Sequence, residues 1–199
     1  MSKINKLRDI NKSQKSFIIY KSNKGFNLYT DFSKKIILNN RNILGFLKKK
    51  NSVKTLKPTD LFIGFFGYEL LNNLIGIKVP KQKNSSFPKG IFYKPEKIIS
   101  LNNKLNYHQK SRLGLKKKFK ININRQSYTK IFNRFKKKIK SGETYQIKIC
   151  TKYKIKSKID PLDLFCRLSQ TNLAPESFMV KDKDYSIISC SPENLITKK

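Results

Sequence analysis

The clearest hydrophobic pattern lies in the last third of the chain, where a helical repeat gives way to an alternating one. Between residues 127 and 140, apolar side chains recur at spacings of three and four, which predicts one apolar face of a helix. From residue 145 to residue 155, apolar and polar residues alternate, which predicts a strand with one buried face. Gly142 lies between the two segments and can adopt the left-handed conformation that ends a helix. Gln146 falls near the start of the strand, opposite the apolar set, where a side chain can line a site.

Shorter apolar segments upstream predict several strands and two short helices. Strands are expected over residues 17–20, 26–30, 35–38, 61–68, 90–93 and 97–99, and helices over residues 43–47 and 69–75. A turn at Pro95 is expected to separate the last two strands. The polar, basic residues 1–15 predict a loose arm or a short helix.

Two glycines inside the apolar segment 61–68 point to packing and not to phosphate binding. Gly64 and Gly67 are not followed by the Lys-Ser/Thr pair that a phosphate-binding loop requires. Glycine within a strand usually marks a bulge or a close approach by another backbone. We therefore expect either a bulge or a close approach by another backbone in this segment.

The end of the chain carries helix-start and hairpin signals. Asp160 is a good N-cap and Pro161 suits the first helical position. Strands over residues 178–180 and 185–189, joined by a polar turn, predict an antiparallel hairpin. All the elements together predict an α+β fold with antiparallel sheets and flanking helices. The basic, weakly patterned residues 104–120 mark the expected boundary between an N-terminal part, residues 1–120, and residues 121–199.

The charge balance is strongly basic. The 199 residues contain 45 Lys and Arg against 12 Asp and Glu, a formal charge of +33. Such a charge is typical of nucleic-acid binding, and a basic nucleic-acid-binding module is one alternative function. However, lysine is spread along the whole chain together with abundant Asn and Ile, which codon usage in an AT-rich genome would produce. We therefore expect no specific nucleic-acid partner.

Cysteine usage and hydropathy predict a cytoplasmic protein. Cys150, Cys166 and Cys190 cannot all pair and lack metal-ligand spacing, so they are expected to be reduced thiols. No apolar run approaches the length of a membrane span, and the N-terminus has no secretory signal pattern. We expect no membrane partner.

Four short motifs carry a family resemblance. They are Gly142-Glu143-Thr144-Tyr145-Gln146-Ile147, Asp160-Pro161-Leu162-Asp163-Leu164-Phe165, Thr171-Asn172-Leu173-Ala174-Pro175 and Ser189-Cys190-Ser191-Pro192-Glu193. In this order and spacing they resemble the chorismate-binding enzymes, and within them component I of anthranilate synthase or of aminodeoxychorismate synthase. The resemblance implies an incomplete chorismate-binding-enzyme fold. Residues 1–120 would be the N-terminal scaffold region, and residues 121–199 the first part of the catalytic domain.

The resemblance implies catalytic roles for Glu193 and Gln146. Chorismate loses a hydroxyl group as a nucleophile adds, and a positioned carboxylic acid, Glu193, can supply the proton that hydroxide needs to leave. Family members that add water carry a lysine base at the position of Gln146, whereas members that add an amine carry glutamine, which cannot take up a proton. Chorismate and a glutamine amidotransferase subunit that supplies ammonia are therefore the implied partners. Without the resemblance, Glu193 would be interpreted as a solvated turn carboxylate.

A ligand pocket is implied near Ser22, Asn172 and Pro175. In the synthase family a Glu-Ser pair at the end of the first strand helps to hold a tryptophan, and here Lys21 precedes Ser22. A lysine would repel the amino group of tryptophan, which argues against tryptophan control and favours aminodeoxychorismate synthase. The alternatives are a turn hydroxyl for Ser22 and a plain helix-to-strand connection for residues 172–175.

The resemblance places the Mg²⁺ ligands of the complete enzyme outside this chain. In the family, glutamates in the second half of the catalytic domain hold the ion, and this chain ends soon after Glu193. We therefore expect an N-terminal fragment of a longer enzyme, with no synthase activity by itself. A nonfunctional truncated gene product is a further alternative. The choice between anthranilate and aminodeoxychorismate as product stays open.

Overall fold

The computed structural model describes residues 3–22, 25–48, 60–68, 70, 75–76, 87–101, 105, 107, 119–156 and 158–191. Contacts divide the chain into two compact units: residues 1–109 with 161–199, and residues 110–160. The first unit therefore combines segments from both ends of the chain. The predicted division at residue 120 stays a prediction.

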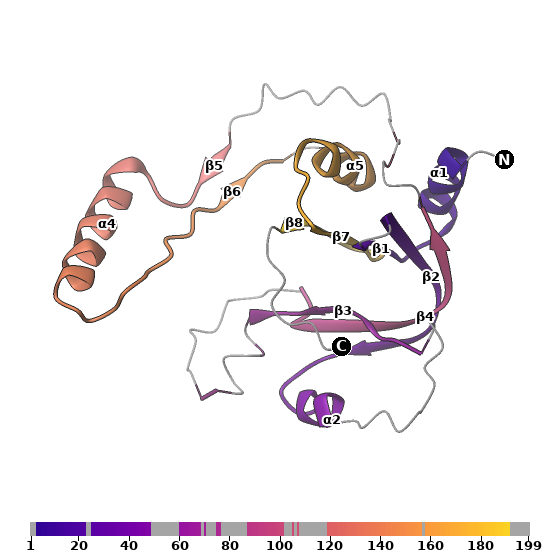
Figure 1. Cartoon of the computed structure of the whole chain (residues 1–199), viewed down its shortest axis with the longest axis horizontal. Helices are drawn as coiled ribbons and strands as arrows, with labels where there is room; N and C mark the ends of the chain where they lie inside the picture. Colours follow the sequence, from indigo (N-terminus) through magenta and orange to yellow (C-terminus); the bar gives the residue numbers. More distant parts are fainter. Residues whose placement is uncertain are drawn as a thin grey trace. The chain divides into compact units, whose positions relative to one another are not determined.

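The first unit is built on one six-stranded antiparallel sheet with the strand order β3-β4-β2-β1-β7-β8 (Figure 1). Its strands are β1 (Phe17–Ser22), β2 (Gly25–Ile37), β3 (Ile63–Phe66), β4 (Gly90–Ser100), β7 (Glu176–Lys181) and β8 (Ser186–Ser191). The helices of this unit whose bounds are described are α1 (Lys3–Ser13), α2 (Ile43–Lys48) and α5 (Pro161–Thr171). The pairing of β1 with both β2 and β7 attaches the predicted C-terminal hairpin, β7–β8, to the N-terminal strands. The α+β prediction is confirmed.

The sheet buries side chains on both faces, because successive strand residues point to opposite sides. On one face, Ile19 and Leu28 pack in a cluster with Leu162 and Phe165 of α5 and with Leu7 of α1. The opposite face is covered by a second cluster, which consists of Ile18, Tyr29, Ile91, Tyr93 and Val180. Helices α1 and α5 therefore pack on the same face of the sheet.

Two long strands replace four predicted short ones, and Pro95 accounts for the difference. Both β2 and β4 are continuous strands, β4 through the turn expected at Pro95, and they pair along most of their length. Pro95 lies opposite Phe32, where the register shifts between Phe32 and Lys34. A bulge is one of the few places where a ladder tolerates proline, which has no N–H to donate. The predicted turn at Pro95 was wrong, because long-range pairing outweighed the local turn preference.

Residues 110–160 contain α4 (Arg125–Lys140) and the short strands β5 (Lys120–Ile121) and β6 (Tyr153–Lys154), which pair with each other. The predicted helix is confirmed, with the Asn124 side chain accepting from the Ser127 N–H at 2.8 Å and Gly142 at φ +76° after its end. The predicted strand over residues 145–155 is found only at β6. The alternation of apolar and polar residues has the two-residue period of a strand. A strand also needs a neighbouring strand with which its backbone can form hydrogen bonds.

Candidate functional site

The structure places Gln146 at the surface, in a segment that pairs with no strand among the residues it describes. The side chain of Gln146 is exposed, and its backbone carbonyl accepts a hydrogen bond from the Thr144 hydroxyl at 3.2 Å. Just before it, Glu143 forms an ion pair with Lys138, and the hydrogen bond from Lys138 lowers the pKa of Glu143. Glu193 lies outside the described residues. The assignment of both residues to one catalytic site stays a prediction.

The structure brings together two distant segments that carry the predicted ligand-pocket residues. Antiparallel pairing of β1 with β7 places the end of β1, where Ser22 lies, beside the segment that precedes β7. That segment contains Asn172 and Pro175, whose side chains are both exposed. The direct link between the segments is a hydrogen bond of 2.7 Å from the Lys21 ammonium to the Ala174 carbonyl. The side chain of Ser22 lies outside the described residues.

A second contact joins the same two segments through Tyr20 and Glu176. The Tyr20 hydroxyl donates to the Glu176 carboxylate at 2.5 Å. Burial and this hydrogen bond raise the pKa of Tyr20 to about 12, so the phenol stays protonated at neutral pH. Glu176 is thus held in place by the first strand.

The position of the Lys21 ammonium limits what this corner of the sheet can bind. Lys21 is half-buried, and the Ala174 carbonyl also accepts from the Ser177 hydroxyl at 3.3 Å. A ligand ammonium placed here would meet a resident cation and a carbonyl that already accepts two hydrogen bonds. Because like charges repel strongly where water is partly excluded, this arrangement disfavours an amine ligand.

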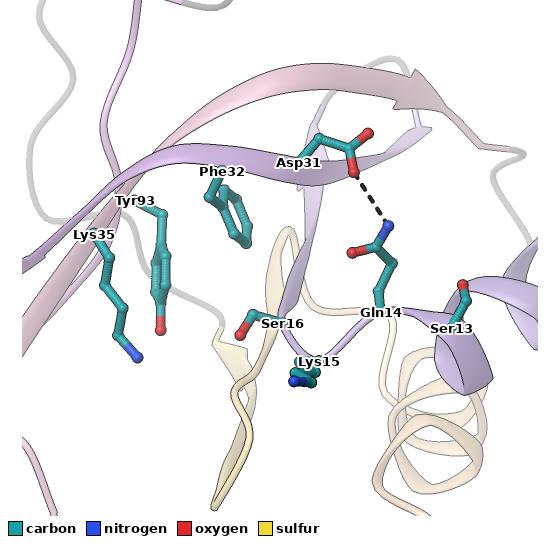
Figure 2. A pocket seen from close by; sticks show the side chains of 8 residues that line it. All are labelled: Ser13, Gln14, Lys15, Ser16, Asp31, Phe32, Lys35 and Tyr93. Carbon is teal, nitrogen blue, oxygen red and sulfur yellow. Dashed lines mark hydrogen bonds between the residues drawn. The ribbon is translucent and has the colours of Figure 1, made fainter.

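A separate pocket of about 420 Å³ lies at the β2 bulge, between β2, β4 and the connection from α1 to β1 (Figure 2). Asp31 on its wall has a φ of +53°, a conformation that Asp tolerates better than most residues. Its carboxylate accepts from the Gln14 amide at 3.1 Å, and the Phe32 and Tyr93 rings lie 4.6 Å apart. Among the lining residues, Gln14 and Asp31 are thus engaged with each other.

Asp182 is a buried acceptor for donors from separate parts of the first unit. Its carboxylate accepts from the Lys35 ammonium at 2.6 Å, the Tyr93 hydroxyl at 2.5 Å, the Ser16 hydroxyl at 3.0 Å and the Lys183 N–H at 2.7 Å. Burial by itself would raise the pKa of Asp182, but these donors, led by Lys35, hold it well below its usual range. The carboxylate therefore stays charged and ties β2, β4 and the β7–β8 turn together.

Sequence patterns did not single out the Asp182 network. Its sequence context, Lys181-Asp182-Lys183-Asp184, indicates a polar turn, and the structure does place it at the end of β7. Ser16, Lys35 and Tyr93 contribute from three other segments, so the donors meet only after the sheet has formed. No local signal in the sequence could have found this network.

Among the described residues, no group of three or more His, Cys, Asp or Glu side chains could hold a metal ion. The assignment of the Mg²⁺ ligands to a part of the enzyme outside this chain stays a prediction. In the described part of the chain, no helix has the length and apolar character of a membrane span.

The fold and the paired segments define an α+β protein whose C-terminal hairpin completes an N-terminal sheet. A sequence model of the family described as chorismate binding enzyme matches residues 6–199, and the chain belongs to that family. The resemblance seen in the four motifs is thereby confirmed.

The chain is similar to part of several curated proteins named anthranilate synthase component 1. It is 25% identical over 182 residues to the protein of Buchnera aphidicola subsp. Pemphigus spyrothecae, covering 74% of this chain and 35% of that relative. It is 24% identical over 199 residues to that of Buchnera aphidicola subsp. Diuraphis noxia, covering 82% of this chain and 37% of the relative. It is 30% identical over 118 residues to that of Buchnera aphidicola subsp. Rhopalosiphum maidis, covering 56% and 23%. The match thus spans little more than a third of these relatives at most.

Proposed function

We propose that this chain is the first part of a synthase that adds an amine to chorismate, corresponding to component 1 of anthranilate synthase. The observation that carries the proposal is the family match over residues 6–199, together with relatives that share that name. Chorismate is the proposed substrate, and ammonia from a glutamine amidotransferase subunit is the proposed nucleophile. In the complete enzyme, Mg²⁺ is proposed to be held by residues outside this chain.

In this proposal, Glu193 and Gln146 have different roles in the reaction. Glu193 protonates the departing hydroxyl group, because hydroxide leaves poorly without a proton. Gln146 lines the site without taking up a proton, which suits ammonia better than water as the nucleophile. The exposed position of Gln146 leaves its amide free to face a substrate.

Two observations support different products. The shared name of the relatives supports anthranilate. The Lys21–Ala174 contact supports an enzyme without tryptophan control, which had favoured aminodeoxychorismate. Loss of control by tryptophan and the choice of product are separable properties of such an enzyme. We therefore propose that the product is anthranilate and, independently, that the enzyme does not bind tryptophan.

A chimera tests the proposed function. In it, this chain replaces the matching third of the Buchnera aphidicola subsp. Pemphigus spyrothecae protein, and chorismate, ammonia and Mg²⁺ are supplied. We expect anthranilate to form, and Glu193→Gln to lower kcat at least about 100-fold, because positioned acids contribute about 10²–10⁴-fold. The 199-residue chain alone is expected to show no turnover.

The matched control is Glu96→Gln, an exposed carboxylate on β4, which should leave kcat unchanged. A folded chimera that makes neither anthranilate nor aminodeoxychorismate would refute the proposed function and favour a nonfunctional remnant. Full activity of the Glu193→Gln chimera would instead remove only the role assigned to Glu193.

Tryptophan is expected not to bind the chain. Lys21 already places a cation against the Ala174 carbonyl, where the amino group of tryptophan would have to bind. Tryptophan at about 1 mM should therefore shift the melting temperature of the chain by less than about 1 °C. Differential scanning fluorimetry measures the shift, with phenylalanine at the same concentration as the ligand control. A saturable rise of several degrees with tryptophan alone would contradict the expectation.

A further inference from the structure

The pocket at the β2 bulge lies apart from the residues that the family motifs single out. Its walls come from the end of α1, the connection from α1 to β1, and strands β2 and β4 (Figure 2). Ser16 precedes the first residue of β1, whereas Ser22 is the last residue of that strand. The pocket is therefore at the opposite end of β1 from the predicted ligand pocket, and it is a separate place where a small molecule can bind.

The bulge in β2 brings an aromatic ring and an ammonium group to the same face of the sheet. Side chains three residues apart on a regular strand point to opposite faces, as Phe32 and Lys35 would without an interruption. The register shift between Phe32 and Lys34 adds one residue to β2 and reverses the alternation. Both side chains consequently lie beside Tyr93. The Phe32 ring centroid is 4.6 Å from the Tyr93 ring centroid, and the Lys35 Nζ is 5.6 Å from it.

Asp31, next to the bulge, has an unfavourable backbone conformation. Its φ of +53° is the only positive value at a non-glycine residue in the described chain. Such a conformation persists where the surrounding structure imposes it, and it is concentrated at functional sites such as ligand-binding sites. The Asp31 carboxylate accepts from the Gln14 amide at 3.1 Å, which joins two walls of the pocket. The unfavourable conformation thus coincides with the contact that shapes the pocket.

Two lysine side chains determine which ligand charge the pocket favours. Lys35 donates one hydrogen bond to Asp182, and an ammonium group has two further protons to donate. The Lys35 side chain is 44% exposed, so those protons can reach a ligand. Lys15 also lines the pocket, and none of the ion pairs among the described residues involves it. Because the whole chain has a formal charge of +33, the surrounding potential favours an anion as well.

We propose that this pocket binds a small planar carboxylate, whose ring packs on Phe32 and whose carboxylate accepts from Lys15 and Lys35. A volume of about 420 Å³ suits a compound with one ring, since small-molecule sites measure roughly 300–1,000 Å³. Aromatic rings contribute by tilted or offset contacts with a ligand ring. An ammonium group beside the carboxylate, as in an amino acid, would be repelled by both lysines, so the ligand class excludes amino acids. Anthranilate, the product proposed above, belongs to this class, but the site itself does not rest on that function.

Titration of the 199-residue chain with benzoate tests the proposal. Two-dimensional ¹H–¹⁵N NMR locates the ligand, and we expect saturable shifts of the amides of residues 13–16 and 31–35. A Kd of about 1 mM is expected for a compound of this size. Acetate has the same charge without the ring, and benzylamine has the same ring with the opposite charge. Each should bind at least about tenfold more weakly than benzoate.

A matched pair of lysine variants tests the role of charge. Lys15→Gln should weaken benzoate binding about threefold or more, because it removes one cation from the pocket. The control is Lys12→Gln, which removes an exposed lysine of α1 that does not line the pocket and should leave the affinity unchanged. Phe32→Leu removes the ring but stays apolar, and it should lower the preference for benzoate over acetate about threefold or more. The amide spectrum of each variant without ligand verifies that the fold is retained.

The outcomes separate this proposal from an adventitious ion and from the proposed function. Equal binding of benzoate and acetate, or equal losses in the two lysine variants, would show an adventitious ion only and overturn the proposal. Shifts without saturation at lysines along the whole chain, or equal binding of benzylamine, would overturn it as well. A saturable benzoate site, in a chain whose chimera makes no anthranilate, supports the pocket and counts against the proposed function. An active chimera without the benzoate site would overturn the pocket alone.

Discussion

Asp182→Asn is expected to lower the free energy of unfolding by about 3 kcal/mol, because it removes an acceptor on which several buried donors depend. Asp182 is only 7% exposed, and its carboxylate accepts from Lys35, Tyr93, Ser16 and the Lys183 N–H. Asparagine offers one acceptor oxygen and a donor amide, which would face groups that are themselves donors. Urea unfolding followed by far-UV circular dichroism measures the loss.

The neighbouring Asp184→Asn is the matched control for this prediction. Asp184 is exposed in the same turn, so its replacement should change stability by no more than about 0.5 kcal/mol. Equal losses for the two variants would show that the effect comes from the turn and not from the buried network.

The effect of Asp182→Asn should also depend on pH. The pKa of Asp182 is lowered in the folded chain, so its contribution is present above the unfolded value of about 3.9 and is lost as pH falls through the folded value. The difference in unfolding free energy between the wild type and Asp182→Asn should therefore be constant near neutral pH and shrink below about pH 4. A difference that grows on acidification would contradict this assignment of charge.

Gly64→Ala is the second large effect, and we expect it to cost about 3 kcal/mol or more. Gly64 lies on β3 opposite Phe92 of β4. An added Cβ would lie 1.9 Å from the Ile91 carbonyl oxygen and 2.7 Å from the Phe92 Cα. These are backbone atoms in a paired strand, so the clash can be relieved only by separating β3 from β4. Urea unfolding and amide exchange of β3 measure the loss.

Gly45→Ala is expected to have the opposite effect, a gain in the free energy of unfolding. Gly45 lies within α2, and an added Cβ there would meet no atom within 4 Å. Alanine is the better helix former, so this variant should gain about 0.5–1 kcal/mol. If both glycine variants were neutral, the close approach of β4 to Gly64 would be disproved.

Local signals predicted the elements whose causes are local. The start of α5 follows from Pro161 at its first position, and the hairpin of β7 and β8 follows from two apolar segments around a polar turn. Of the two features expected at Gly64, a bulge or a close backbone approach, the structure shows the close approach, because a glycine within an apolar strand leaves room for a neighbouring backbone that any side chain would fill. Pro95 was assigned wrongly because its turn preference is local, whereas the bulge that accommodates it belongs to the pairing of β2 with β4.

The candidate site was predictable only in part. Family motifs singled out Ser22, Asn172 and Pro175, and strand pairing brings their segments together. The contact that joins those segments, from Lys21 to the Ala174 carbonyl, depends on that pairing and on a lysine long enough to reach across it.

By itself, the sequence determined the family, the α+β class and the periods of the main helix and strands, since these depend on residue identity and spacing within short segments. Only the tertiary structure decided which strands pair and that four donors meet at Asp182. The physical reason is that a repeat shows which face of an element is apolar, whereas burial depends on a second surface that the repeat does not specify.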